Sequence, residues 1–196
     1  MNNCNRPRCT WVNLNNPVYV DYHDCEWGVP CREDGKLFEM LLLESFQAGL
    51  SWECVLNKRE NFRAAFDGFD AEKIAHYGDD KKVALMNDVG IIRNQLKIEA
   101  VVTNAKIFLK IREEHGSFYD YLCSFTGGEI VRESCDTRTT SPLSDAISAD
   151  LKRRGMKFVG STIIYSYLQA VGVIDGHEER CEWGKEEADG GSFSVR

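Results

Sequence analysis

Two pairs of cysteine and histidine residues lie at opposite ends of this chain: Cys9 and His23 near its start, and His177 and Cys181 near its finish. Two thiolates and two imidazoles are the ligand set of a closed, tetrahedral structural zinc site. His177 and Cys181 are four residues apart and would share one face if their segment were helical. A metal bound by all four would tie the first turns of the chain to the last. Spacing alone also allows a second interpretation, in which these are buried thiols and hydrogen-bonded histidines.

Aromatic and acidic side chains form a second group, in the N-terminal third. Glu44 ends the otherwise apolar run 40–44, where a carboxylate is costly to bury unless a polar group meets it. A purine could meet this carboxylate, because its exocyclic amine is a hydrogen-bond donor. Tryptophan faces stack on bases, and they bind cationic rings better than neutral ones. Each residue alone is equally consistent with core packing or an exposed helix end. Their coincidence indicates a base pocket, formed by Trp11, Tyr22, Trp27, Glu44 and Trp52.

A glycine-bounded turn at residues 155–160 is a third candidate, within a helix–hairpin–helix element at about 144–171. Glycines let a turn present its backbone N–H groups to a ligand, and the next helix adds the positive end of its dipole. This arrangement favours an anion such as a DNA phosphate, which positions a duplex without reading its sequence. The alternative is an ordinary helical hairpin with a solvated basic face. The expected DNA contacts are Lys157, Gly160, Ser161 and Thr162.

The elements that must position these groups are helices, because apolar residues recur at helical spacing through most of the chain. We therefore predict an all-α fold, with no extended sheet and a loop at residues 127–140. Asp79 or Asp80 is expected to cap one helix, and Ser161 another. The predicted helices are 36–47, 51–55, 59–66, 71–75, 79–86, 93–114, 118–125, 143–154 and 163–171.

Composition is that of an ordinary globular protein: 196 residues, of which 43% are hydrophobic and 28% charged. We expect one domain over residues 1–184 and a disordered Gly/Ser-rich tail over 185–196. The net charge of −7 excludes a surface coated with basic residues but allows a local basic patch. No apolar run approaches the ~20 residues that span a bilayer, and the first residues lack the apolar core of a signal peptide. The protein is therefore expected to be cytoplasmic, without membrane contact.

The eight cysteines of such a protein are expected to stay reduced. Cys54 and Cys123 lie among apolar residues and are predicted to fill the core. No role is predicted for Cys4, Cys25, Cys31 and Cys135.

Seven stretches of the sequence resemble 3-methyladenine DNA glycosylase I, the Tag-type family of DNA repair enzymes. Among them are Arg8-Cys9-Thr10-Trp11-Val12 and Gln47-Ala48-Gly49-Leu50-Ser51-Trp52, and the resemblance extends over roughly residues 8–181. It implies a helix–hairpin–helix glycosylase fold in which two helical lobes flank a base pocket. The stretches are 8–12, 22–30, 37–40, 47–52, 58–61, 90–93 and 152–162.

The resemblance also implies roles for individual residues. One structural zinc ion (Zn2+) would be held by Cys9, His23, His177 and Cys181. In the base pocket, Glu44 would be the catalytic residue and hydrogen-bond the purine edge with Tyr22. Trp52 would stack on the base and Trp11 contact its edge, with Trp27 close by. The hairpin at 155–160 would hold the DNA backbone.

The implied reaction is monofunctional hydrolysis, which releases 3-methyladenine from alkylated double-stranded DNA and leaves an abasic site. Methylation at N3 gives adenine a positive charge, so the base leaves without added acid once it is flipped out of the duplex. The resemblance further implies a monomer. Two alternatives stay open: a zinc-stapled DNA-binding module without activity, and a glycosylase with a broader range of alkylated bases. Asp175 follows the hairpin's second helix, where many relatives in the wider superfamily place a catalytic aspartate, and it is a further candidate.

Overall fold

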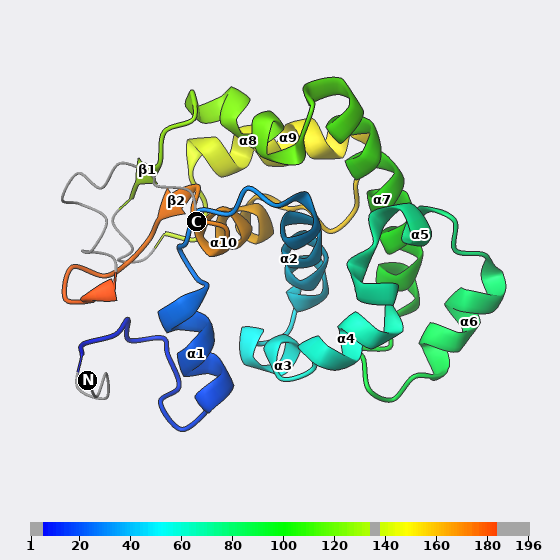
Figure 1. Ribbon diagram of the computed structural model, residues 1–196, viewed down its shortest axis with the longest axis horizontal. Coiled ribbons are helices and arrows are strands. Elements are labelled where there is room, and N and C mark those ends of the chain that lie inside the picture. Colours follow the sequence, from blue (N-terminus) through cyan, green and yellow to red (C-terminus); the bar gives the residue numbers. More distant parts are fainter. Residues whose placement is uncertain (1–5, 134–137, 184–196) are drawn as a thin grey trace.

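The computed structural model describes residues 6–133 and 138–183, and it is helical almost throughout this part of the chain (Figure 1). The predicted all-α class is confirmed for these residues. Cys4, Cys135 and the expected tail at 185–196 lie outside them. The helices are α1 Pro17–Cys25, α2 Asp34–Gln47, α3 Trp52–Leu56, α4 Arg59–Ala65, the 3-10 helix η2 Asp67–Phe69, α5 Ala71–Ala75, α6 Asp79–Asn87, α7 Gln95–His115, α8 Phe118–Thr126, α9 Pro142–Arg154 and α10 Ser161–Ala170.

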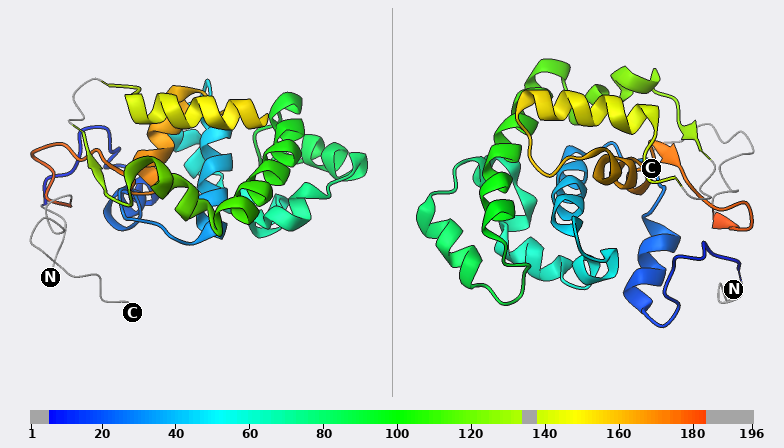
Figure 2. Two further views of the ribbon diagram at one scale, coloured as in Figure 1. Left: turned by 90° about the horizontal axis from the view of Figure 1, so that it is seen from above. Right: turned by 180° about the vertical axis from the view of Figure 1, so that it is seen from behind.

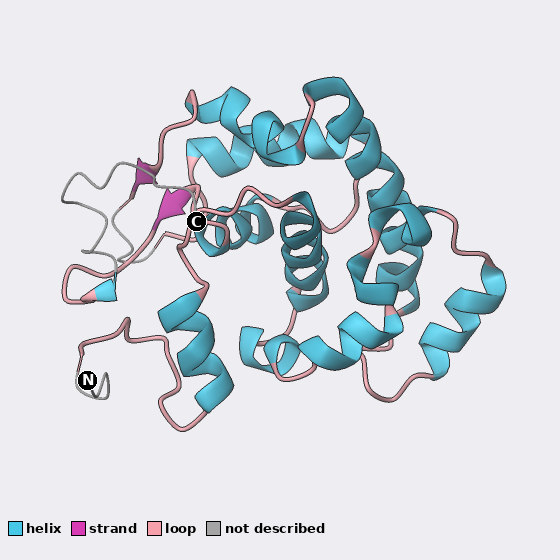
Figure 3. Ribbon diagram, in the orientation of Figure 1, coloured by secondary structure: helices cyan, strands magenta, loops and turns pink. Residues whose placement is uncertain are grey.

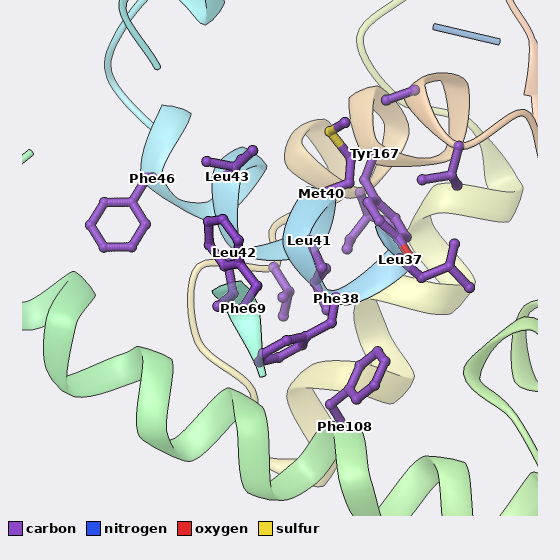
Figure 4. Packing of buried hydrophobic residues seen from close by; sticks show 14 of the residues in the cluster. Leu37, Phe38, Met40, Leu41, Leu42, Leu43, Phe46, Phe69, Phe108 and Tyr167 are labelled. Carbon is purple, nitrogen blue, oxygen red and sulfur yellow. The ribbon is translucent and has the colours of Figure 1, made fainter. Parts of the chain in front are cut away.

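Helix α2 runs through the centre of the molecule, and residues 37–46 are all buried (Figure 4). A helix that is apolar on every side has to be covered on every side. Helix α10 packs against it from one direction and α7 from another, where the rings of Phe38 and Phe108 lie 4.7 Å apart. This complete enclosure makes Glu44, near the C-terminal end of α2, a buried carboxylate.

The other helices lie around this centre (Figures 1 and 2). Helices α4 to α7 lie on one side of α2, with α5 packed along α7. Helix α1 and the two ends of the described chain lie on the opposite side, where the backbone N–H of Glu182 donates to the carbonyl of Pro7 at 3.0 Å. The N-terminal and C-terminal segments are thereby brought side by side. No described helix is both long and apolar enough to cross a lipid bilayer.

Helix α1 was not predicted, because residues 13–17 resemble a turn. In the structure these residues start the helix: the side chain of Asn16 accepts a hydrogen bond from the N–H of Val18, and Pro17 occupies the first turn. Proline is favourable there because its missing N–H would have no partner in the helix.

The described residues contain no extended sheet, but four of them form a short strand pair that was not predicted. Strand β1, Val131–Arg132, pairs in parallel with β2, Ile174–Asp175, and β1 lies within the predicted loop (Figure 3). Two-residue strands are too short to show an alternating pattern in sequence. Their pairing fixes the backbone immediately before His177.

Two predicted helix caps are also wrong. Gly78 caps α6, whereas Asp79 and Asp80 lie in its first turn, where carboxylates favour the helix dipole. Gly160 caps α10, and Ser161 is its first residue.

Candidate functional site

A cavity of about 200 Å³ lies between α1, α2, α3 and α10. It is smaller than the roughly 300–1,000 Å³ of pockets that hold drug-sized ligands, a size that suits one base. The structure brings all five predicted pocket residues to its wall, although their roles stay predictions. The cavity is lined by Trp11, Tyr19, Tyr22, Trp27, Glu44, Gln47, Trp52, Arg138, Ser166 and Gln169.

The aromatic walls form two contacting pairs. The rings of Trp11 and Trp27 lie 4.8 Å apart in an edge-to-face arrangement, and those of Tyr22 and Trp52 lie 5.3 Å apart. Tyr22 is buried on α1, and Trp52 begins α3 after the capping residue Ser51. Such ring pairs favour particular mutual orientations, so each ring helps to place its neighbour in the cavity wall.

Glu44 supplies the carboxyl group of the cavity and is only 4% exposed. Burial raises the pKa of this carboxyl from 4.5 to about 8, because the charged form loses its hydration. An empty site at neutral pH therefore favours the protonated acid, and a cation in the cavity would favour the carboxylate.

A second polar atom in the wall also lacks a partner. The indole N–H of Trp52 is buried and makes no hydrogen bond within the described part of the chain. Buried donors are nearly always paired, so an unpaired one at a cavity indicates a site for a ligand or an ordered water.

Five wall residues were missed by sequence reasoning: Tyr19, Gln47, Arg138, Ser166 and Gln169. Tyr19 precedes Tyr22 by three residues on the unpredicted α1, so recognising that helix would have placed both on one face. Burial, followed by the charges of Glu53 and Glu44, raises the pKa of Tyr19 to about 12, so its hydroxyl stays protonated. Ser166 and Gln169 share the same spacing on α10, where they follow its first, polar turn and lie among apolar and tyrosine residues.

Three of the four predicted metal ligands come together beside this cavity. The candidate ligand atoms of Cys9, His23 and Cys181 all lie within 4.8 Å of one another, and all three residues are buried. The thiol sulfur of Cys181 is 3.6 Å from Nε2 of His23. On the other side of this ring, Nδ1 lies 2.9 Å from the carboxylate of Asp24. An imidazole held at Nδ1 by a carboxylate offers Nε2 to a metal, which is the usual arrangement around bound zinc.

His177, the fourth predicted ligand, lies beside this trio but outside it. Its ring is 5.8 Å from that of His23 and 4.6 Å from that of Trp27. Its Nδ1 lies 2.9 Å from the carboxylate of Asp175, so this histidine is oriented in the same way as His23. His177 and Cys181 are joined by a turn, so the helix on which they would share one face is not present here.

Asp175, which contacts His177, lies away from the cavity. The carboxylate of Asp175 contacts the ring of His177 and forms an ion pair with Arg132 at 3.8 Å. Asp175 does not line the cavity. The interactions with His177 lower the pKa of Asp175 below its usual value. Its observed partners give Asp175 a part in orienting His177.

The hairpin at 155–160 joins α9 to α10 with two residues in left-handed conformations, Gly155 at φ +101° and Phe158 at φ +55°. The predicted contacts Lys157, Gly160, Ser161 and Thr162 lie together on this turn and on the first turn of α10. The side chain of Ser161 is occupied by Asp145 and Ser144, whereas the first backbone N–H groups of a helix have no partner within the helix.

The basic run Lys152-Arg153-Arg154, which precedes the hairpin, is partly neutralised, since Arg153 and Arg154 both pair with Asp150. Among the described cysteines all are free thiols, including the partly buried Cys54 and Cys123.

A larger cavity of about 960 Å³ lies on the other side of Tyr22. Two of its arginines pair with carboxylates, Arg59 with Glu26 and Glu39, and Arg63 with Glu39 and Glu60.

A helical protein with an aromatic cavity, a buried carboxyl group and a glycine-bounded hairpin has the features of a nucleobase-binding protein. The chain belongs to the methyladenine glycosylase family, whose model matches residues 11–185.

Relatives of known function are similar over nearly the whole chain. DNA-3-methyladenine glycosylase 1 of Escherichia coli K12 is 44% identical over 178 residues, which are 89% of this chain and 95% of the relative. DNA-3-methyladenine glycosylase of Haemophilus influenzae is 43% identical over 89% of this chain and 96% of its own.

Solved structures are also similar over nearly the whole chain. A crystal structure of 3-methyladenine DNA glycosylase I superposes with a TM-score of 0.85 at 44% identity and covers 90% of this chain and 98% of that one. A variant of such an enzyme in complex with 3-methyladenine superposes with a TM-score of 0.86 at 34% identity, over 91% of this chain and 98% of that one.

Proposed function

We propose that this protein is a DNA base-excision glycosylase that removes 3-methyladenine from alkylated double-stranded DNA and leaves an abasic site. The observation that carries the proposal is the small aromatic cavity with the buried carboxyl of Glu44 in its wall. Relatives named for this activity support it, as does the related structure that holds 3-methyladenine.

The reaction follows from the charge on the base. In N3-methylated deoxyadenosine the C1′–N9 bond breaks, and its electron pair moves onto the base, which leaves as neutral 3-methyladenine. The oxygen of a water molecule bonds to C1′, and a proton from that water is released to solvent. The positive charge makes the base a good leaving group, so the protein has to extrude the nucleotide, bind the base and admit water.

The five predicted wall residues then have roles in binding the extruded base. Trp52 stacks on the ring, and its unpaired N–H is available to a polar atom of the substrate. Trp11 contacts the base edge, with Trp27 behind it. Tyr22 and Glu44 hydrogen-bond the purine edge. A cationic base stabilises the ionised carboxylate of Glu44, so binding is coupled to loss of the proton that this group holds in the empty cavity.

We further propose that one structural Zn2+ is held by Cys9, His23, Cys181 and His177. The donor set supports this: three donors already cluster, and the two imidazoles are each oriented by a carboxylate at Nδ1. Zinc would supply a cross-link between the chain ends, and four protein donors leave no position for a reactive water.

This cluster also supports two walls of the cavity. The ring of Trp11 lies 5.2 Å from that of His23, and Trp27 stacks on His23 at 6.0 Å. Fixing His23 therefore fixes the tryptophans that line the base pocket.

The hairpin at 155–160 is the proposed contact with the DNA backbone, made through Lys157, Gly160, Ser161 and Thr162. This is a phosphate contact, which positions the duplex while the cavity selects the lesion. The protein is expected to act as a monomer in the reducing cytoplasm, where the thiols of the metal cluster stay available.

Purified, zinc-loaded protein incubated with methylated duplex DNA tests the function. Release of 3-methyladenine, measured by chromatography, is the expected result, and Glu44→Gln should lower its rate. Glu113→Gln, on the exposed face of α7, is the matched control and should leave the rate unchanged. Release of 7-methylguanine as well would indicate the broader-range alternative. DNA binding without release of either base would favour the non-enzymatic module.

A further inference from the structure

Lys97 is a buried cation that the proposed mechanism does not use. It lies in the first turn of α7 and is only 6% exposed. Its ammonium group donates to the carbonyl oxygen of Phe46 at 2.8 Å and to that of Ala48 at 2.7 Å. A buried charge is costly unless its hydrogen bonds are satisfied. The two carbonyls satisfy the ammonium group, so this position favours a lysine.

The two carbonyls belong to the segment that joins the main groups of the cavity. Phe46 lies two residues after Glu44, and Ala48 opens the turn that leads through Gly49, at φ +82°, to Trp52. Carbonyls at the end of a helix have no partner within it, and a lysine there also complements the negative end of the helix dipole. The ammonium of Lys97 therefore closes α2 and fixes the start of the turn to Trp52.

The DNA-contacting hairpin lies against the same lysine. The ring of Phe158 is 5.8 Å from the Lys97 ammonium, a cation–π contact with a residue that itself has positive φ. Two turns further along α7 the buried side chain of Asn104 holds the hairpin backbone: it donates to the carbonyl of Lys157 and accepts from the N–H of Lys157, both at 2.9 Å. Helix α7 thus holds the hairpin and the cavity turn at once.

We propose that Lys97 is a positioning residue that sets the geometry of the base pocket, holding the turn between Glu44 and Trp52 in register with the hairpin at 155–160. Burial lowers the pKa of Lys97, but two carbonyls and an aromatic face all stabilise its charged form. The placement of the turn rests on the contacts alone, and its consequence for base release rests on the proposed function.

The first test observes the turn without substrate. The chain contains four tryptophans, so protein labelled with 5-fluorotryptophan gives four fluorine resonances, and Trp52→Phe identifies that of Trp52. Lys97→Met keeps the length of the side chain but removes its charge and its donors. We expect it to shift or broaden the Trp52 resonance and to leave that of Trp183, at the C-terminal segment, in place.

Matched variants separate positioning from general loss of stability. Lys106→Met changes an exposed lysine on the same helix, and Ile111→Val loosens the core at the far end of α7. Neither should move the Trp52 resonance. Lys97→Gln, which keeps a neutral donor, replaces Lys97→Met if the latter does not fold, and it should give a smaller shift in the same direction. An unmoved Trp52 resonance in the folded Lys97 variants would overturn the proposal.

The second test measures the pocket and the hairpin separately. Because misplacing binding groups by about an ångström costs up to roughly a hundredfold, Lys97→Met should weaken binding of free 3-methyladenine by about tenfold in calorimetry. Binding of undamaged duplex, which depends on phosphate contacts, should change less than twofold. Equal losses in both would indicate a merely structural residue and refute the proposal. If the unmodified protein neither binds nor releases 3-methyladenine, the proposed function fails, while the fluorine experiment still decides the role of Lys97.

Discussion

Replacing the buried carboxyl of Glu44 by an amide should stabilise the empty protein at alkaline pH while reducing its activity. Glu44→Gln keeps the size and hydrogen-bonding capacity of the side chain but removes its ability to ionise. The carboxyl of Glu44 has its pKa raised by burial from 4.5 to about 8, so the folded protein holds this proton more tightly than the unfolded chain does.

The sign of the pH dependence follows from that difference. Below pH 4.5 Glu44 is protonated in both the folded and the unfolded state, so its titration does not lower the free energy of unfolding. As the pH rises the unfolded chain loses the proton first, so the free energy of unfolding falls until the pH passes about 8, where the folded protein ionises too. At about 1.4 kcal/mol per pH unit the full shift corresponds to at most about 5 kcal/mol. Water that enters the cavity solvates the ionised carboxylate, so we expect a measured difference of about 2 kcal/mol.

Urea denaturation of the wild-type protein and of Glu44→Gln at pH 5 and at pH 9 measures this difference. The advantage of Glu44→Gln should be small at pH 5 and grow by about 2 kcal/mol at pH 9. Glu113→Gln controls for the general effect of removing an acidic residue and should show no such growth. Adding 3-methyladenine should reduce the advantage, because the ligand binds the wild-type site better. An equal advantage at both pH values would refute the idea that Glu44 is held as a neutral acid.

Three other predictions concern the metal cluster and the hairpin. Cys181→Ser should lower the thermal midpoint and the bound zinc measured by elemental analysis, yet folded protein should keep measurable base release; native protein without zinc would contradict this. Asp175→Asn should weaken zinc affinity by about ten- to a hundredfold, as is usual when the partner of a ligating histidine is lost, while base release by zinc-saturated protein changes little; abolished release would instead make Asp175 catalytic. Lys157→Ala should weaken duplex binding for all sequences alike and reduce the salt dependence of the binding constant by about one unit of slope, and an unchanged slope would remove Lys157 from the interface.

The long helices could be predicted from the sequence because their apolar spacing is repeated over several turns. Helix α7 follows this pattern over 21 residues, and the apolar residues of α2 recur throughout its segment 37–46. Helix α1 was hidden because its capping residues, Asn16 and Pro17, are also turn formers. The parallel pair of β1 and β2 depends on contact between segments more than 40 residues apart, which local pattern does not reveal.

The candidate site, too, could be predicted only in part from the sequence. The predicted pocket residues could be chosen because aromatic side chains and one carboxylate on an apolar segment coincide in the N-terminal third: Trp11, Tyr22, Trp27, Glu44 and Trp52. Ser166 and Gln169 have ordinary polar side chains, and they line the cavity only because α10 packs across α2. The contact of Lys97 with Phe46 and Ala48 spans about fifty residues and likewise needed the folded chain.

The support that His23 gives to Trp11 and Trp27 has a consequence for the order of events during synthesis. Cys181, which completes the cluster around His23, leaves the ribosome after every helix described above. A nascent or truncated chain can therefore contain all of these helices and still lack firm placement for two of its tryptophans. Under the proposed role of the cluster, full capacity to excise a base is postponed until Cys181 has been synthesised, and fragments that end before Cys181 excise bases more slowly than the protein that contains it.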